Sequence, residues 1–132
     1  MTLARPGTLA IEVPDPRFYV VRISGEVDRL LVARLLRLIE TRLWVAAGGH
    51  VATAHVLLDL SDVHEVRGGA LGGLRHAAHV ARIRGATLHL TGCGALVTHL
   101  DLRERQALRA FTILPSVEAA LTELGGAAVQ PS

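Results

Sequence analysis

The sequence contains no lysine, so all fourteen of its Lys and Arg positions are arginines. This absence excludes Schiff-base chemistry on a lysine amine and the phosphate-binding loop that depends on a lysine. The single cysteine, Cys93, cannot form an internal disulfide, which favours a reducing compartment. Residues 5–7 (Arg-Pro-Gly) interrupt the N-terminal apolar run too early for a signal peptide, and no apolar stretch reaches about 18 residues. We therefore expect a cytoplasmic protein without a membrane span.

Aromatic side chains and net charge are also scarce. The sequence has two phenylalanines, one tyrosine and one tryptophan, and its net charge is only +2. The arginines are scattered along the sequence among acidic residues. Nucleic-acid-binding proteins instead gather basic side chains into a stripe with stacking aromatics. The sequence therefore predicts no nucleic-acid partner.

Apolar residues, in contrast, are plentiful and make up half of the 132 positions. A chain of this length and apolar content can bury one hydrophobic core. We predict a single domain over residues 1–132, with its core over 9–124. The small and polar residues at 125–132 are typical of a flexible tail.

The first half of the chain has two apolar runs followed by a helical pattern. Residues 9–13 and 18–24 are separated by Pro-Asp-Pro-Arg, which predicts antiparallel strands joined by a turn, the second strand ending at Gly25. Leucines then recur at helical spacing over residues 27–47, with Asp28 in the first turn and Gly48-Gly49 as the stop.

The second half begins with a βαβ pattern. Residues 55–60 form an apolar run, 61–67 a polar connection, 69–84 an amphipathic helix ended by Gly85, and 87–91 another apolar run. This order predicts two parallel strands with a right-handed crossover. The remaining elements are a short helix over 95–100, a charged stretch without assignment over 101–109, a brief strand over 111–113, and a helix from Ser116, as N-cap, to Leu124.

Two groups of residues contain the side chains of known sites but lack their spacing. His76 and His79 lie three apart on one helix, but zinc needs a third and usually a fourth ligand. Residues 61–65 include serine, aspartate, histidine and glutamate, but the members of a catalytic triad come from separate elements that converge. Cys93 has no neighbour in sequence that would activate its thiol. We therefore predict no metal, no cofactor and no enzymatic activity.

Residues 68–73 are rich in glycine and lie between a strand and a helix. They match neither the dinucleotide-binding fingerprint nor a phosphate-binding loop. The glycines allow a tight turn from strand to helix. Alternatively, the free N–H groups at this helix start can hold an anion.

Four motifs, taken in order, resemble one family. Residues 23–28 (Ile-Ser-Gly-Glu-Val-Asp) resemble the Gly-Glu-Leu-Asp signature of STAS domains, and 58–63 (Leu-Asp-Leu-Ser-Asp-Val) are similar to the family's Leu-Asp-Leu-Ser-x-Val strand end. Residues 85–90 resemble its next strand, and 111–121 its closing strand and helix. The resemblance spans residues 9–124. The family it points to includes the bacterial anti-sigma factor antagonists. It implies an α/β fold with a four- to five-stranded mixed sheet and about four helices, packed mainly on one face.

The chain departs from this family at the phosphorylation site. Anti-sigma factor antagonists carry Asp-Ser-Ser-Gly-Leu at the start of the second helix, and an anti-sigma factor kinase phosphorylates the first serine. The aligned residues 67–71 read Arg-Gly-Gly-Ala-Leu. Gly68 occupies the acceptor position and cannot be phosphorylated, and Arg67 replaces the acidic residue. A phosphate would add about −1.5 to −2 charges at this contact surface, so the usual switch is missing.

The resemblance implies a non-enzymatic module that binds a serine-kinase anti-sigma factor or a related regulator and so controls sigma-factor-dependent transcription. Two alternatives stay open: an anion or nucleotide sensor, and a scaffold subunit of a stressosome-like or lipid-transport assembly. Phosphorylation at Ser61 or Thr91 and a homodimer also stay open. The partner-binding residues that the resemblance implies are Glu26, Asp28, Arg67, Gly68, Gly69 and Leu71. The anion would bind at Arg67, Gly68 and Gly69.

Overall fold

A computed structural model describes residues 6–47 and 52–129 of the chain. The strands are β1 (Thr8–Glu12), β2 (Phe18–Val27), β3 (His55–Val66), β4 (Thr87–Thr91) and β5 (Thr112–Leu114). The helices are α1 (Arg29–Ala47), α2 (Ala70–Ile83), α3 (Gly94–Val97), α4 (Leu102–Leu108) and α5 (Val117–Val129).

The five strands form one mixed sheet whose spatial order, β1-β2-β3-β4-β5, is also their order in the chain. β1 is antiparallel to β2, and every other neighbouring pair is parallel. This arrangement confirms the predicted α/β fold with a mixed sheet. It also confirms the predicted hairpin, in which the Phe18 N–H donates to the Asp15 carbonyl across the turn at 2.9 Å.

The middle of the sheet is longer than the sequence predicts. β2 continues past Gly25 to Val27, because Gly25 has a φ of 83° and two register shifts keep the strand paired with β3. The prediction of a connection over residues 61–67 is wrong, because β3 runs on to Val66. This second half of β3 has only β2 as a neighbour, since pairing with β4 stops at Asp59. Most side chains of residues 61–66 are exposed, which explains why this half of the strand is polar.

The predicted βαβ unit is confirmed, since β3 and β4 are parallel and α2 connects them. α2 ends where predicted, at Gly85, whose φ is 86°. The Ala86 N–H donates to the Ala81 carbonyl at 2.9 Å, which satisfies one of the last helical carbonyls.

The C-terminal third contains one helix more than expected. The charged stretch without assignment forms α4. Asp101 and Glu104 form a capping box at its N-terminus. In α5, the Ser116 hydroxyl accepts the Ala119 N–H at 3.0 Å, as an N-cap does. α5 extends beyond the expected end at Leu124 to Val129, whereas residues 130–132 and the predicted stop at Gly48-Gly49 lie outside the described residues.

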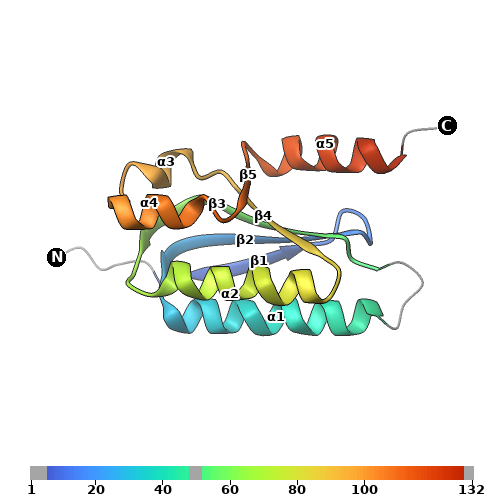
Figure 1. Cartoon of the computed structure of the whole chain (residues 1–132), viewed down its shortest axis with the longest axis horizontal. Helices are drawn as coiled ribbons and strands as arrows, with labels where there is room; N and C mark the ends of the chain where they lie inside the picture. Colours follow the sequence, from blue (N-terminus) through green and yellow to red (C-terminus); the bar gives the residue numbers. More distant parts are fainter. Residues whose placement is uncertain (1–5, 48–51, 130–132) are drawn as a thin grey trace.

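The helices cover the two faces of the sheet unequally. α1 and α2 lie side by side on one face, and α5 lies on the other (Figure 1). Leu96 of α3 and Leu108 of α4 belong to the same hydrophobic core as Leu35 of α1 and Leu74 of α2. Four of the five helices therefore contribute side chains to one core. α5 closes a smaller cluster around Phe18.

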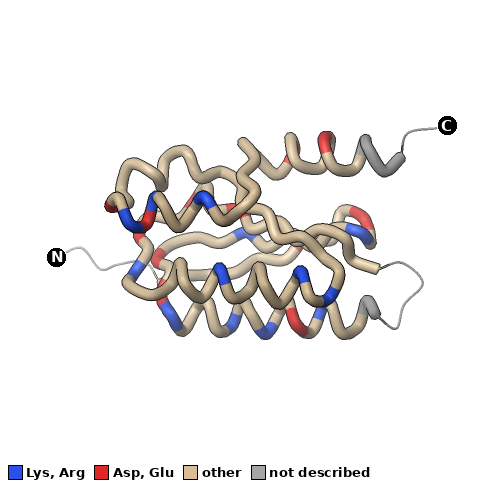
Figure 2. Tube along the Cα trace, viewed as in Figure 1, with Lys and Arg blue, Asp and Glu red and all other residues tan. Residues whose placement is uncertain are grey.

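Charge is segregated in the folded molecule, although the arginines are scattered in the sequence. Six of the fourteen arginines but only one of the twelve acidic residues, Glu40, lie in α1 and α2. These two helices therefore have a net charge of +5, and the rest of the chain has a net charge of −3. Figure 2 shows the basic positions along these helices.

Candidate functional site

The predicted site lies where β2 and β3 end and where α1 and α2 begin. Parallel strands place their carboxyl ends at the same edge of a sheet, and here Val27 of β2 pairs with Val66 of β3. The Arg67 N–H donates to the Val27 carbonyl at 2.8 Å and holds the chain at this edge. Arg67, Gly68 and Gly69, which we call the glycine corner, then lead into α2, and all three are exposed.

Arg67 is engaged by acidic side chains. Its Nε pairs with Oε1 of Glu26, and its distance to the Glu65 carboxylate is 4.0 Å. The hydrogen bond from Arg67 to Glu26, followed by the charges of Glu26 and Glu65, raises the pKa of the Arg67 guanidinium. An incoming anion would have to compete with Glu26 for Arg67, so the structure favours the anion-sensor alternative less than the sequence does.

Asp28 and Arg29 occupy the neighbouring helix start. Asp28 Oδ1 accepts the Leu31 N–H at 2.8 Å, so Asp28 caps α1 and does not lie in its first turn as expected. The guanidinium of Arg29 lies over Gly69. A Cβ on Gly69 would be only 2.5 Å from Arg29 Nε. Gly69 also has a φ of 87°, a conformation that favours glycine. A side chain at this position would therefore disturb the corner.

Gly68 and Leu71 have opposite surroundings. A Cβ on Gly68 would meet no atom within 4 Å, and Gly68 does not have a positive φ. Position 68 is thus open and able to hold a side chain. Leu71 is only 6% exposed and belongs to the core of the sheet and helices. The prediction of Leu71 as a contact residue therefore needs correction, because its side chain is used for internal packing.

The two alternative phosphorylation positions lie near one buried carboxylate. Asp59, 5% exposed, accepts hydrogen bonds from the Ser61 hydroxyl at 3.1 Å and the Thr91 hydroxyl at 3.2 Å, and pairs with Arg22 at 2.8 Å. Thr91 is fully buried and out of reach of a kinase, whereas Ser61 is exposed. Ser61 lies in the second half of β3.

The remaining reactive groups do not form a metal-binding cluster in the part of the chain that the structure describes. His76 and His79 are exposed on α2, and no three His, Cys, Asp or Glu side chains gather there around a common point. Burial, with a smaller contribution from Asp59, raises the pKa of the Cys93 thiol to about 11. The thiol is therefore protonated and unreactive near neutral pH.

A pair of histidines on the α5 face was not predicted from the sequence. His55 Nδ1 and His89 Nε2 are 3.1 Å apart, and the His55 ring stacks on Phe18. His89 is 4% exposed, and its Nδ1 has no hydrogen-bond partner among the described residues. Burial, followed by the charge of His55, lowers the pKa of His89 to about 4. The alternation of side chains along β3 and β4 could have placed both residues on one face, but not at this distance.

Arg29 was not predicted either. Its position in the sequence, directly after Asp28, indicates a helix start. Only the packing of α1 against α2 brings its guanidinium over Gly69.

Neither a family model nor a curated protein matches the sequence. Solved structures do match. The chain is similar to the Bacillus anti-sigma factor antagonist SpoIIAA in its unphosphorylated form, with 13% identity, a TM-score of 0.68 and coverage of 90% of this chain and 99% of that one. It is similar to an anti-sigma factor antagonist from Mycobacterium paratuberculosis, with 20% identity, a TM-score of 0.68 and coverage of 93% and 99%.

The fold also occurs within a larger protein of another kind. The chain is similar to part of SLC26A9, with 14% identity and a TM-score of 0.66; the match covers 94% of this chain and 24% of that one. Across the described part of the present chain, no helix is both long and apolar enough to cross a bilayer. At these identities the similarity concerns the fold. The chain therefore has the STAS fold of the anti-sigma factor antagonists, as the sequence motifs predicted.

Proposed function

We propose that this chain is a non-enzymatic cytoplasmic protein that binds an anti-sigma factor, or a related regulator, without a phosphoserine switch. The observation that carries the proposal is the glycine corner. Gly68 is exposed at the start of α2, where the resemblance places the phosphoacceptor, and it offers no hydroxyl. SpoIIAA, which has the same fold, has been solved in an unphosphorylated and a phosphorylated form.

The proposed contact surface consists of polar groups on three segments. Glu26 lies near the end of β2, Asp28 caps α1, and the glycine corner starts α2. The Arg67–Glu26 ion pair is exposed on the arginine side, so it can be rearranged when a partner binds. Because Gly68 has no side chain, a partner can approach the backbone closely. We infer that the complex forms constitutively and that regulation acts elsewhere.

The experiment mixes the purified chain with the serine-kinase anti-sigma factor from the same cell, with and without ATP, and measures complex formation by calorimetry. We expect the native chain to bind equally well in both conditions. The variant Gly68→Ser should bind without ATP and lose binding with ATP, because phosphate adds about −1.5 to −2 charges at the contact. The space around Gly68 accommodates this serine without a clash.

A matched control is Gly72→Ser, since Gly72 is also exposed and has open space around its Cα. Its binding should not depend on ATP. The proposal fails if the native chain binds none of the cell's anti-sigma factors, or if ATP releases the native complex as readily as that of Gly68→Ser.

The anion-sensor alternative has a direct test in calorimetry with nucleotides and phosphate on the native chain and on Arg67→Ala. Equal or absent heats would exclude it. The scaffold alternative is tested by the size of the native protein in cell extract, because a subunit of a large assembly elutes far ahead of a free monomer or dimer.

A further inference from the structure

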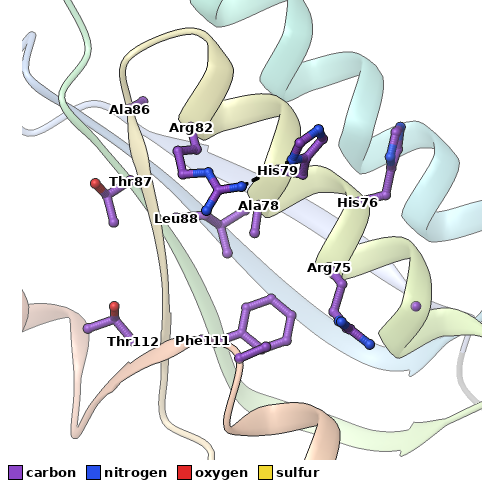
Figure 3. A pocket seen from close by; sticks show the side chains of 12 residues that line it. Arg75, His76, Ala78, His79, Arg82, Ala86, Thr87, Leu88, Phe111 and Thr112 are labelled. Atoms are coloured by element: carbon purple, nitrogen blue, oxygen red, sulfur yellow. Dashed lines mark hydrogen bonds between the residues drawn. The ribbon is translucent and has the colours of Figure 1, made fainter.

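A groove between α2 and the β4–β5 edge contains several basic side chains. Arg75, His79 and Arg82 project from α2, and Thr87 and Thr112 lie opposite (Figure 3). The floor between them includes Ala78, Leu88 and Phe111. No residue of the glycine corner lines this groove, so a ligand bound here would be independent of the proposed anti-sigma factor contact.

The groove has a basic wall without counter-charges. None of its lining residues is acidic. Among the described residues, Arg75 and Arg82 have no carboxylate within salt-bridge distance; the only side-chain hydrogen bond of Arg82 is with His79 Nδ1 at 3.4 Å. Guanidinium groups that face a concave surface without internal partners are free to bind carboxylates from another molecule.

The spacing of the cations matches an extended peptide. Arg75 and Arg82 are seven positions apart on α2, which corresponds to about 10 Å along the helix axis. An extended chain covers this length with about three residues. Two acidic side chains two or three positions apart can therefore reach both guanidiniums, and an intervening apolar side chain can face Phe111.

The charge around the groove favours the same kind of ligand. α1 and α2 together carry six arginines and one glutamate (Figure 2). Such a positive surface attracts an acidic segment from a distance and orients it toward the groove. We propose that the α2–β5 groove binds a short extended acidic peptide segment of a partner protein, through Arg75 and Arg82.

An anionic membrane is the main rival, because Trp44 at the far end of α1 is 71% exposed beside this basic surface. A flat membrane would use the outer arginines of α1, such as Arg34 and Arg37, as much as those in the groove. A peptide can enter the concave site and a membrane cannot, so the position of Arg75 and Arg82 inside the groove favours the peptide.

The test uses the full chain and a fluorescein-labelled peptide of alternating glutamate and leucine, at low ionic strength, with fluorescence anisotropy as the readout. We expect Arg75→Gln/Arg82→Gln to weaken binding about tenfold, since exposed ion pairs contribute modestly. The matched control, Arg34→Gln/Arg37→Gln, removes the same charge from α1 and should change the affinity less than about twofold. A peptide with glutamine in place of glutamate should not bind.

Two further measurements locate the site. Gly72→Glu places a carboxylate at the groove, where the Cα of Gly72 has open space, and should weaken peptide binding while the helix stays intact. Amide chemical shifts of Phe111 and Thr112 should change on peptide addition. The proposal fails if the peptide does not bind, or if both double variants weaken binding equally. It also fails if the chain binds vesicles of anionic lipid or a single-stranded oligonucleotide more strongly than the peptide.

Discussion

Two adjacent glycines of α2 have opposite surroundings. A Cβ on Gly72 would meet no atom within 4 Å, whereas a Cβ on Gly73 would be 2.5 Å from Cγ1 of Val32 on α1. Val32 is β-branched and buried, so it cannot move aside easily. Gly73 therefore sets how closely the two helices approach.

This contrast predicts opposite effects of the same substitution. Gly72→Ala should raise the free energy of unfolding by about 0.5 kcal/mol, because alanine has the higher helix propensity. Gly73→Ala should lower it by about 1–2 kcal/mol, because overpacking outweighs the gain in propensity. Urea unfolding of both variants measures the difference. Equal shifts of the two midpoints would contradict the close contact with Val32.

At the scale of single elements, α4 depends on its capping box. Asp101 Oδ1 accepts the Glu104 N–H at 2.8 Å, and Glu104 accepts the Asp101 N–H at 3.0 Å. A helix of only seven residues is marginal without tertiary contacts and caps. α4 has one buried side chain, Leu108, to anchor it.

We expect Asp101→Ala to destabilise α4 by about 1 kcal/mol, since alanine cannot accept the N–H of the first turn. Asp101→Asn should retain most of the stability, because asparagine is also a good N-cap. Hydrogen exchange at the Arg105 amide, which donates to the Asp101 carbonyl at 2.9 Å, reports the local effect. If the amide exchanges equally fast in both variants, the cap does not hold the helix.

The sequence predicted the elements whose signals are local. The proline-rich turn, the βαβ unit and the glycine stop at Gly85 have short patterns that determine the backbone directly. α4 could also have been predicted, because an aspartate followed three residues later by glutamate is a capping-box pattern. The length of β3 could not, because the pairing of residues 61–66 depends on β2, which is distant in the sequence.

The candidate site was predicted to a similar extent. The glycine corner follows from the motif order, but the contact of Arg29 with Gly69 and the burial of Leu71 follow from helix packing. The groove was not predicted from the sequence. Three segments that are separate in the sequence form it, and only the fold brings them together.

At the scale of the whole molecule, the His55–His89 pair makes stability depend on pH. The pKa of His89 is lowered from 6.5 to about 4, and burial also lowers the pKa of His55. The unfolded chain therefore binds protons that the folded chain does not bind. The contribution of the pair to stability is complete above pH 6.5 and is lost as the pH falls toward 4.

We expect this loss to reach up to about 3 kcal/mol, at about 1.4 kcal/mol for each pKa unit. His89→Leu should flatten the dependence between these pH values, because leucine does not titrate. Asp15, whose pKa Arg17 lowers from 3.8 to about 2, loses its contribution mainly below pH 4, at the acid end of this range. Urea unfolding at several pH values measures the slopes. An unchanged slope in the variant would exclude the pair as its cause.

The agreement between spatial and chain order of the strands has a consequence for synthesis on the ribosome. Each new strand adds to the edge that the preceding strand has just completed, and no later strand must be inserted between two earlier ones. A nascent chain that has emerged only as far as Thr91 already contains four of the five strands and both long helices of the main core. Folding can therefore proceed from the first residues to the last as translation continues.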